Sequence, residues 1–152
     1  MNSNIQKSVQ SLSNFIEHYK TLNQNVSKSG VDWHIDHCLR VVNGISKVLQ
    51  NSNQNDYKSA FNFKRSLVLS LGTMPRGRAK APQTVQATDD ITLDDLQNLH
   101  QKAVQSLDIL KTLPSNSHFQ HPYFGMLNLK QSIRFIEVHN NHHLKIIRDI
   151  LK

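Results

Sequence analysis

Nine histidines occur among the 152 residues of this chain, and five of them fall in two short segments. His34 and His37 lie in one segment, and His139, His142 and His143 lie in the other. Imidazole nitrogens bind Zn²⁺ and related ions, so metal binding is the first chemistry to consider. If the second segment is helical, the i, i+4 spacing places His139 and His143 one turn apart, a spacing that lets two imidazoles chelate one ion.

The segment 129–151 is predicted to be a helix whose apolar face holds this histidine pair. Hydrophobic residues recur there at helical spacing, and the inward face is marked by Leu129, Ile133, Ile136, Ile147 and Ile150. His143 falls at the centre of that face, His139 lies close beside it, and His142 points towards a margin. Burying several polar rings without a shared ligand is costly, so a third imidazole nearby would favour a metal site over isolated core histidines.

The third imidazole is predicted to come from a second helix over residues 32–49, with Asp32 as its N-cap. On the wheel of this helix, His34 lies well inside the apolar face and His37 lies at its edge. The spacing alone therefore favours His34 and leaves His37 as the second candidate. Cys38 also faces the apolar interior, either as a small buried hydrophobe or as a fourth, soft ligand.

Three further helices are expected from the apolar periodicity of the remaining chain. They cover residues 4–23, residues 61–71 with Gly72 as the stop, and a stretch ending before Pro114 that begins with a capping box from Thr92 to Asp95. Asn128 is expected to cap the last helix, and no segment shows the alternation of a strand. The prediction is an all-α protein with one domain over residues 1–152, an antiparallel four-helix bundle with one extra short helix and a long basic loop.

Two loops carry side chains that could contact a substrate. The basic loop over residues 74–83 contains Arg76 and Arg78, which could clamp a carboxylate or phosphate or remain solvated. His121, in the loop before the last helix, could line the site or only cap its loop. We expect a small-molecule substrate rather than nucleic acid, because the basic residues have no aromatic interleaving and no nucleic-acid-binding motif.

Composition sets the wider limits. The net charge is +7, but the 18 Lys and Arg residues are spread along the chain, as in a solvated cationic surface. The single cysteine excludes an internal disulfide, which fits a reducing compartment. We see neither a signal peptide nor an apolar run long enough for a bilayer, so we expect a cytoplasmic protein without a membrane association.

Three motifs together resemble the DinB/YfiT-like superfamily, and most closely a branch of uncharacterised bacterial proteins within it. They are IDHC at 35–38, HPYFG at 121–125 and HNNHH at 139–143, and the resemblance covers most of the chain. It implies a four-helix bundle with a metal-binding triad. His139 and His143 match the family's His-x-x-x-His pair, and His37, followed by Cys38, matches the ligand from the second helix. The resemblance therefore favours His37 over His34.

The resemblance also implies a metal-dependent enzyme, either a transferase that uses a low-molecular-weight thiol or a hydrolase. Three neutral imidazoles suit Zn²⁺, Ni²⁺ or Fe²⁺ better than Mg²⁺ or Ca²⁺ and leave one coordination position open. The alternative is a non-catalytic helical module whose histidines are structural or hold only a stabilising metal. The sequence is also compatible with a homodimer.

Overall fold

The computed structural model describes residues 3–77 and 90–152. Among these residues, helices dominate and a small two-stranded sheet is present. The helices are α1 (Ser3–Ser13), η1 (Ile16–His18), α2 (Val31–Asn51), η2 (Gln54–Asp56), α3 (Phe63–Leu71), α4 (Leu93–Leu110) and α5 (Leu129–Ile150). The strands are β1 (His118–His121) and β2 (Gly125–Asn128).

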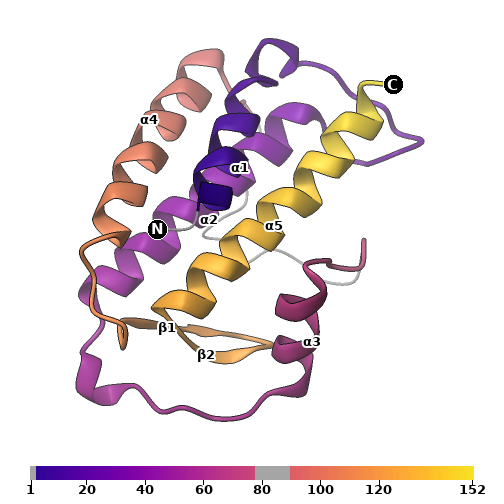
Figure 1. The fold of residues 1–152 in the computed structure, drawn as a ribbon. Coiled ribbons are helices and arrows are strands. Elements are labelled where there is room, and N and C mark those ends of the chain that lie inside the picture. The colour runs from indigo at the N-terminus through magenta and orange to yellow at the C-terminus, as the bar shows by residue number, and fades with distance from the viewer. Residues whose placement is uncertain (1–2, 78–89) are drawn as a thin grey trace.

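Four helices pack around one shared core. Helix α2 contacts α4 and α5, and α1 contacts the same two helices, so α1, α2, α4 and α5 lie alongside one another (Figure 1). Helices α2 and α4 run in the same direction, opposite to α1 and α5 (Figure 1). The length of the connection over residues 50–91 left the up-and-down order of the helices open in the sequence, and in the structure the neighbouring helices α2 and α4 are parallel.

The first helix is shorter than the sequence predicted. It ends at Ser13 rather than near residue 23, and the chain continues as the 3₁₀ turn η1. The amide of His18 donates to the carbonyl of Phe15, and the amide of Tyr19 donates to the carbonyl of Ile16, both at i−3 spacing. Ile16 is still buried, so the apolar periodicity persists although the helix type changes.

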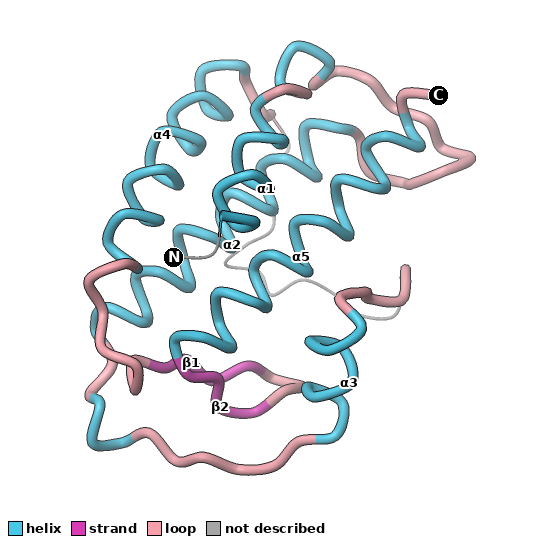
Figure 2. Tube along the Cα trace, in the orientation of Figure 1, coloured by secondary structure: helices cyan, strands magenta, loops and turns pink. Residues whose placement is uncertain are grey.

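The small sheet was not predicted, because each strand has only four residues and falls in the expected loop 115–127. Strands β1 and β2 pair antiparallel, with His121 opposite Gly125, at one end of the four helices (Figure 2). The turn between them comprises residues 122–124 and is followed by Gly125, whose φ of 68° is the left-handed conformation that favours glycine. Gly125, which was interpreted as a turn residue, is the first residue of β2 and directly follows the turn.

The ends of the other helices follow the predicted signals closely. Thr92 and Asp95 form a complete capping box at the start of α4. Asn128 caps α5, and its side chain accepts a hydrogen bond from the backbone amide of Gln131. Gly72 ends α3 with a φ of 66°. Helix α2 begins slightly earlier than predicted, with Gly30 at the N-cap position, so Asp32 lies in the first turn.

The core contains apolar side chains from all four packed helices. Its largest fully buried members include Ile5, Leu39, Leu96, Ile136 and Ile147. Of these, Ile136 and Ile147 lie on the predicted inward face of α5, so the helix presents its histidines to the same interior. Within residues 3–77 and 90–152, no helix is both long enough and apolar enough to cross a bilayer.

Candidate metal site

One histidine from α2 and two from α5 form a compact group inside the protein. His37, His139 and His143 each offer one ring nitrogen, and these three atoms all lie within 4.8 Å of one another. The three side chains are buried, with exposed fractions of 4%, 8% and 8% in that order. The i, i+4 spacing on α5 thus brings His139 and His143 to one point, and α2 supplies the third imidazole.

The distance between ring nitrogens of two members of this group fits a shared ion. Nε2 of His37 lies 3.1 Å from Nε2 of His139. Two nitrogens bound to a tetrahedral Zn²⁺ at about 2.0–2.1 Å lie roughly 3.3 Å apart, so little movement would be needed to place an ion between them. An N–H···N hydrogen bond also fits this distance, and it would satisfy one nitrogen with the proton of the other.

Aromatic rings lie against two of the three imidazoles. The indole of Trp33 stacks on His37, with ring centroids 4.9 Å apart and an interplanar angle of 17°. The ring of Phe135 lies beside His139 at a centroid distance of 5.8 Å. Trp33 lies one turn before His37, and this i, i+4 spacing places both rings on one face of α2.

His34, the alternative ligand from α2, is buried next to the group but is not one of its three members. It is 3% exposed, and its Nδ1 lies 2.9 Å from Nδ1 of His143. Its other ring nitrogen, Nε2, lies 3.0 Å from the hydroxyl of Ser27 in the loop before α2. The wheel therefore identified a deeply buried histidine, whereas the histidine grouped with the pair on α5 is His37.

Burial lowers the pKa of the histidines in this region. Desolvation, followed by the proximity of other imidazoles, lowers the pKa of His139 to about 3 and that of His143 well below its ordinary value. Desolvation and the same kind of proximity lower the pKa of His34 to about 4. The rings are therefore neutral at neutral pH, which is the form that binds a metal.

The carboxylates next to these histidines in sequence are directed elsewhere. Asp36 is buried and accepts a hydrogen bond from Nε of Arg40 at 2.6 Å. Glu137 is also buried and accepts one from Nη1 of Arg134 at 2.7 Å. Within the described part of the chain, the histidine group contains neither carboxylate, so the donors that it could offer to a metal are imidazoles alone.

Cys38 is fully buried in the apolar core and is not a member of the group. Burial raises the pKa of its thiol well above the ordinary value. A buried thiol of this kind behaves as a small hydrophobic residue, which is the first of the two roles that the sequence left open.

The basic residues of the sequence have separate positions. Arg76 forms an ion pair with Asp149 of α5 at 2.7 Å, and its charge contributes to lowering the pKa of both His34 and His142. It therefore lies on the side of the protein where His34 and His142 lie. Arg78 lies outside the described residues.

Arg65 is buried, and its guanidinium donates to the carbonyls of Ala60, Phe124 and Met126, so it ties α3 to the hairpin.

His121 caps the hairpin turn. Its Nδ1 accepts hydrogen bonds from the backbone amides of Tyr123 at 3.1 Å and Phe124 at 3.2 Å. Its ring lies 4.8 Å from that of Phe135, which in turn lies beside His139. Of the two roles considered for His121, the structure shows the capping contacts directly, and it places one aromatic ring in contact with both His121 and His139.

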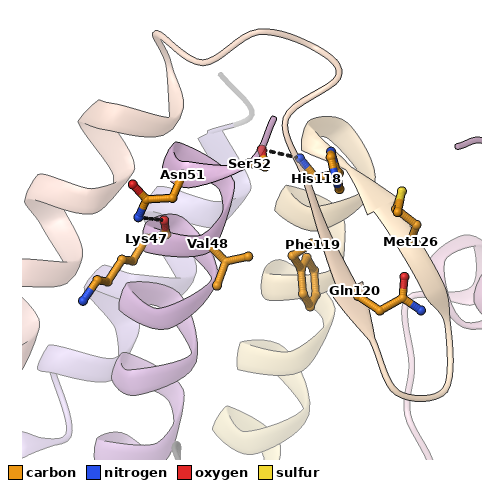
Figure 3. Close-up of a pocket in the computed structure, with 8 residues that line it drawn as sticks. All are labelled: Lys47, Val48, Asn51, Ser52, His118, Phe119, Gln120 and Met126. Carbon is orange, nitrogen blue, oxygen red and sulfur yellow. Dashed lines mark hydrogen bonds between the residues drawn. The ribbon is translucent and has the colours of Figure 1, made fainter. Parts of the chain in front are cut away.

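An open hollow lies away from the histidine group. It has a volume of about 430 Å³ and lies between the C-terminal end of α2 and β1 (Figure 3). Figure 3 shows Val48 and Phe119 on its wall and the hydrogen bond from the amide of His118 to the hydroxyl of Ser52 at its rim. No carboxylate or member of the histidine group lines it, and apart from Lys47 and His118 its lining residues are apolar or uncharged.

Comparisons of this chain with models of protein families, with curated proteins and with solved structures gave no match.

Proposed function

We propose that His37, His139 and His143 bind one divalent transition-metal ion and that the protein is a metal-dependent enzyme of the DinB/YfiT-like type. The observation that carries this proposal is the closeness of three donor nitrogens, all within 4.8 Å, in the interior of the protein. The absence of a carboxylate from this group favours Zn²⁺, Ni²⁺ or Fe²⁺ over Mg²⁺ or Ca²⁺.

The proposed reaction, which rests on the resemblance to the DinB/YfiT-like superfamily, is a transfer to a low-molecular-weight thiol or a hydrolysis, with a small molecule as substrate. Three protein ligands leave one position open, and an ion held in this way lowers the pKa of a water or thiol that occupies it. The neighbouring carboxylates Asp36 and Glu137 are each paired with an arginine, so no carboxylate of the described chain is assigned as a general base.

Arg76 is proposed to contact an anionic group of the substrate. Its side chain is 49% exposed, and its present partner is the partly exposed Asp149. An exposed ion pair of this kind contributes little to stability, so a carboxylate or phosphate can compete for the guanidinium. We expect Arg76→Gln to leave the metal content unchanged and to weaken the inhibition of the proposed enzymatic turnover by inorganic phosphate. Equal inhibition of both proteins would remove Arg76 from this role.

The decisive experiment is metal analysis of the protein purified without a His-tag and without added metal. We expect close to one ion per chain, and loss of that ion in His139→Ala and in His143→Ala. His18→Ala is the matched control, because His18 is an exposed histidine outside the group. A metal content near zero, without uptake of added Zn²⁺ or Ni²⁺, would contradict the proposal.

A second candidate function follows from the low exposure of the ligands, none above 8%. Such burial also suits a metal that only stiffens a non-catalytic helical module. Turnover of a substrate by the metal-loaded wild type distinguishes the two functions. If the metal is structural, His139→Ala lowers the melting temperature while no thiol transferase or hydrolase substrate is turned over by the metal-loaded wild type.

A further inference from the structure

A short chain of polar groups runs outward from His143 towards the loop before α2. Nδ1 of His143 lies 2.9 Å from Nδ1 of His34, and Nε2 of His34 lies 3.0 Å from Oγ of Ser27. Both histidines are buried, so water does not compete freely for these nitrogens. Each ring nitrogen of His34 thus has one protein partner.

The protons on the hydrogen-bonded side chains of His143, His34 and Ser27 can be arranged in only two ways. A neutral imidazole carries one N–H, so a single proton lies between the two Nδ1 atoms. If it belongs to His34, then Nε2 of His143 carries the remaining proton of that ring and cannot bind a metal. If it belongs to His143, its Nδ1 donates to His34, its Nε2 presents a lone pair, and Nε2–H of His34 donates to Ser27.

We propose that His34 is a positioning residue that accepts the Nδ1–H of His143 and thereby fixes the ring orientation and tautomer in which Nε2 of His143 binds the metal. This inference rests on the proposed metal site. Metal-bound histidines commonly donate their second N–H to such a partner. Here the partner is the imidazole of His34 on another helix. Ser27 in turn accepts the Nε2–H of His34 and so fixes the tautomer of that ring.

Two features support this arrangement over a role of His34 as a ligand. His34 is absent from the group whose nitrogens lie within 4.8 Å of one another, although it touches His143. Oγ of Ser27 also accepts the backbone amide of Ser29 at 3.1 Å. A hydroxyl oxygen has two lone pairs, so it can accept the second proton, from His34, at the same time.

A matched pair of substitutions tests the proposal. Asn places its Oδ1 where His34 has Nδ1, whereas Leu has a similar shape without an acceptor. We expect His34→Leu to weaken the affinity for Co²⁺ by about 10–100-fold, as is usual when such an outer partner is lost, and His34→Asn to restore most of it. Ser27→Ala is expected to weaken it less than His34→Leu does.

The second readout is the number of imidazoles bound to the metal, measured by X-ray absorption of the Zn²⁺-loaded proteins. We expect three in the wild type and still three in His34→Leu. Loss of one imidazole would make His34 a ligand and overturn the proposal, as would equal Co²⁺ affinity in His34→Leu and the wild type, or failure of His34→Asn to recover affinity. A wild type that binds no Co²⁺ would instead contradict the metal site itself.

Far-UV circular dichroism of the metal-free variants separates misfolding from loss of orientation. We expect the spectra of His34→Leu and His34→Asn to match that of the wild type, so that a difference in Co²⁺ affinity reports the lost acceptor. If His34→Leu does not fold, the comparison of His34→Asn and Ser27→Ala with the wild type carries the test. Full loss of Co²⁺ binding in His34→Asn would then overturn the proposal.

Discussion

The indole ring of Trp33 lies almost parallel to the imidazole of His37, and their centroids are 4.9 Å apart. Trp33 is the one tryptophan of the chain. The ring of His143 is also close, at a centroid distance of 6.1 Å from the indole. Any change at the histidine group therefore occurs beside the only indole in the protein.

Titration with Ni²⁺ is expected to quench the fluorescence of Trp33. The quenching should saturate near one ion per chain, because a paramagnetic ion bound by His37 lies next to the stacked indole. His139→Ala should require much more Ni²⁺ for the same quenching, and His18→Ala should behave as the wild type. Quenching that rises without saturation, equally in all three proteins, would indicate collision with free Ni²⁺.

Bound metal is expected to stabilise the fold. An ion that binds only the native state adds about 2.7 kcal/mol to the free energy of unfolding at a free concentration of 100 Kd. For a chain of this length, that corresponds to a rise in melting temperature of roughly 5–10 °C. Calorimetry with and without Zn²⁺ measures it, and an unchanged melting temperature at saturating Zn²⁺ would contradict the prediction.

Arg65→Met is expected to lower the free energy of unfolding by about 1.5–3 kcal/mol, the usual contribution of hydrogen bonds from a charged donor. The buried guanidinium donates to the carbonyl of Phe124 at 3.2 Å and to that of Met126 at 2.9 Å. Lys64→Met is the control, because Lys64 is the exposed neighbour on the same helix. Chemical denaturation that finds equal losses in both variants would exclude this role.

The protein is expected to lose stability as the pH falls from about 6.5 to 4, in part through His121. Desolvation lowers the pKa of His121 from 6.5 to about 4 in the folded state. The unfolded state therefore binds more protons than the folded state in this range. Titration of His121 thus leaves the free energy of unfolding unchanged above pH 6.5 and lowers it as the pH falls towards 4.

His121→Asn removes this titration and keeps an acceptor atom at the position of Nδ1. The free energy of unfolding of the variant should fall less steeply than that of the wild type between pH 7 and pH 5, as measured by urea denaturation. Parallel pH profiles would show that His121 gains its proton as easily in the folded protein as in the unfolded chain.

Periodicity and capping signals predicted the long helices well, because both depend on neighbouring residues. Thr92 and Asn128 begin α4 and α5 as expected. The end of α1 could not be predicted in this way, since Ile16 is buried whether the chain continues as an α-helix or turns into η1. The hairpin also escaped prediction, because strands of four residues are too short to show alternation.

The choice between His34 and His37 shows a different limit. A helical wheel ranks residues by the face on which they lie, and His34 is indeed buried. It does not tell which ring reaches the pair on α5, since that depends on how α2 and α5 pack. The resemblance favoured His37, and the structure places His37 with His139 and His143.

His37 and His139 are 102 positions apart along the chain. The pair His139 and His143 needs only α5, whereas the complete group exists only after α2 has closed a loop of that length, which costs conformational entropy. Three-ligand binding thus begins late in folding, when most native contacts are already in place. We expect a bound ion to slow unfolding strongly while leaving the folding rate almost unchanged, so that its main effect is a longer lifetime of the native state.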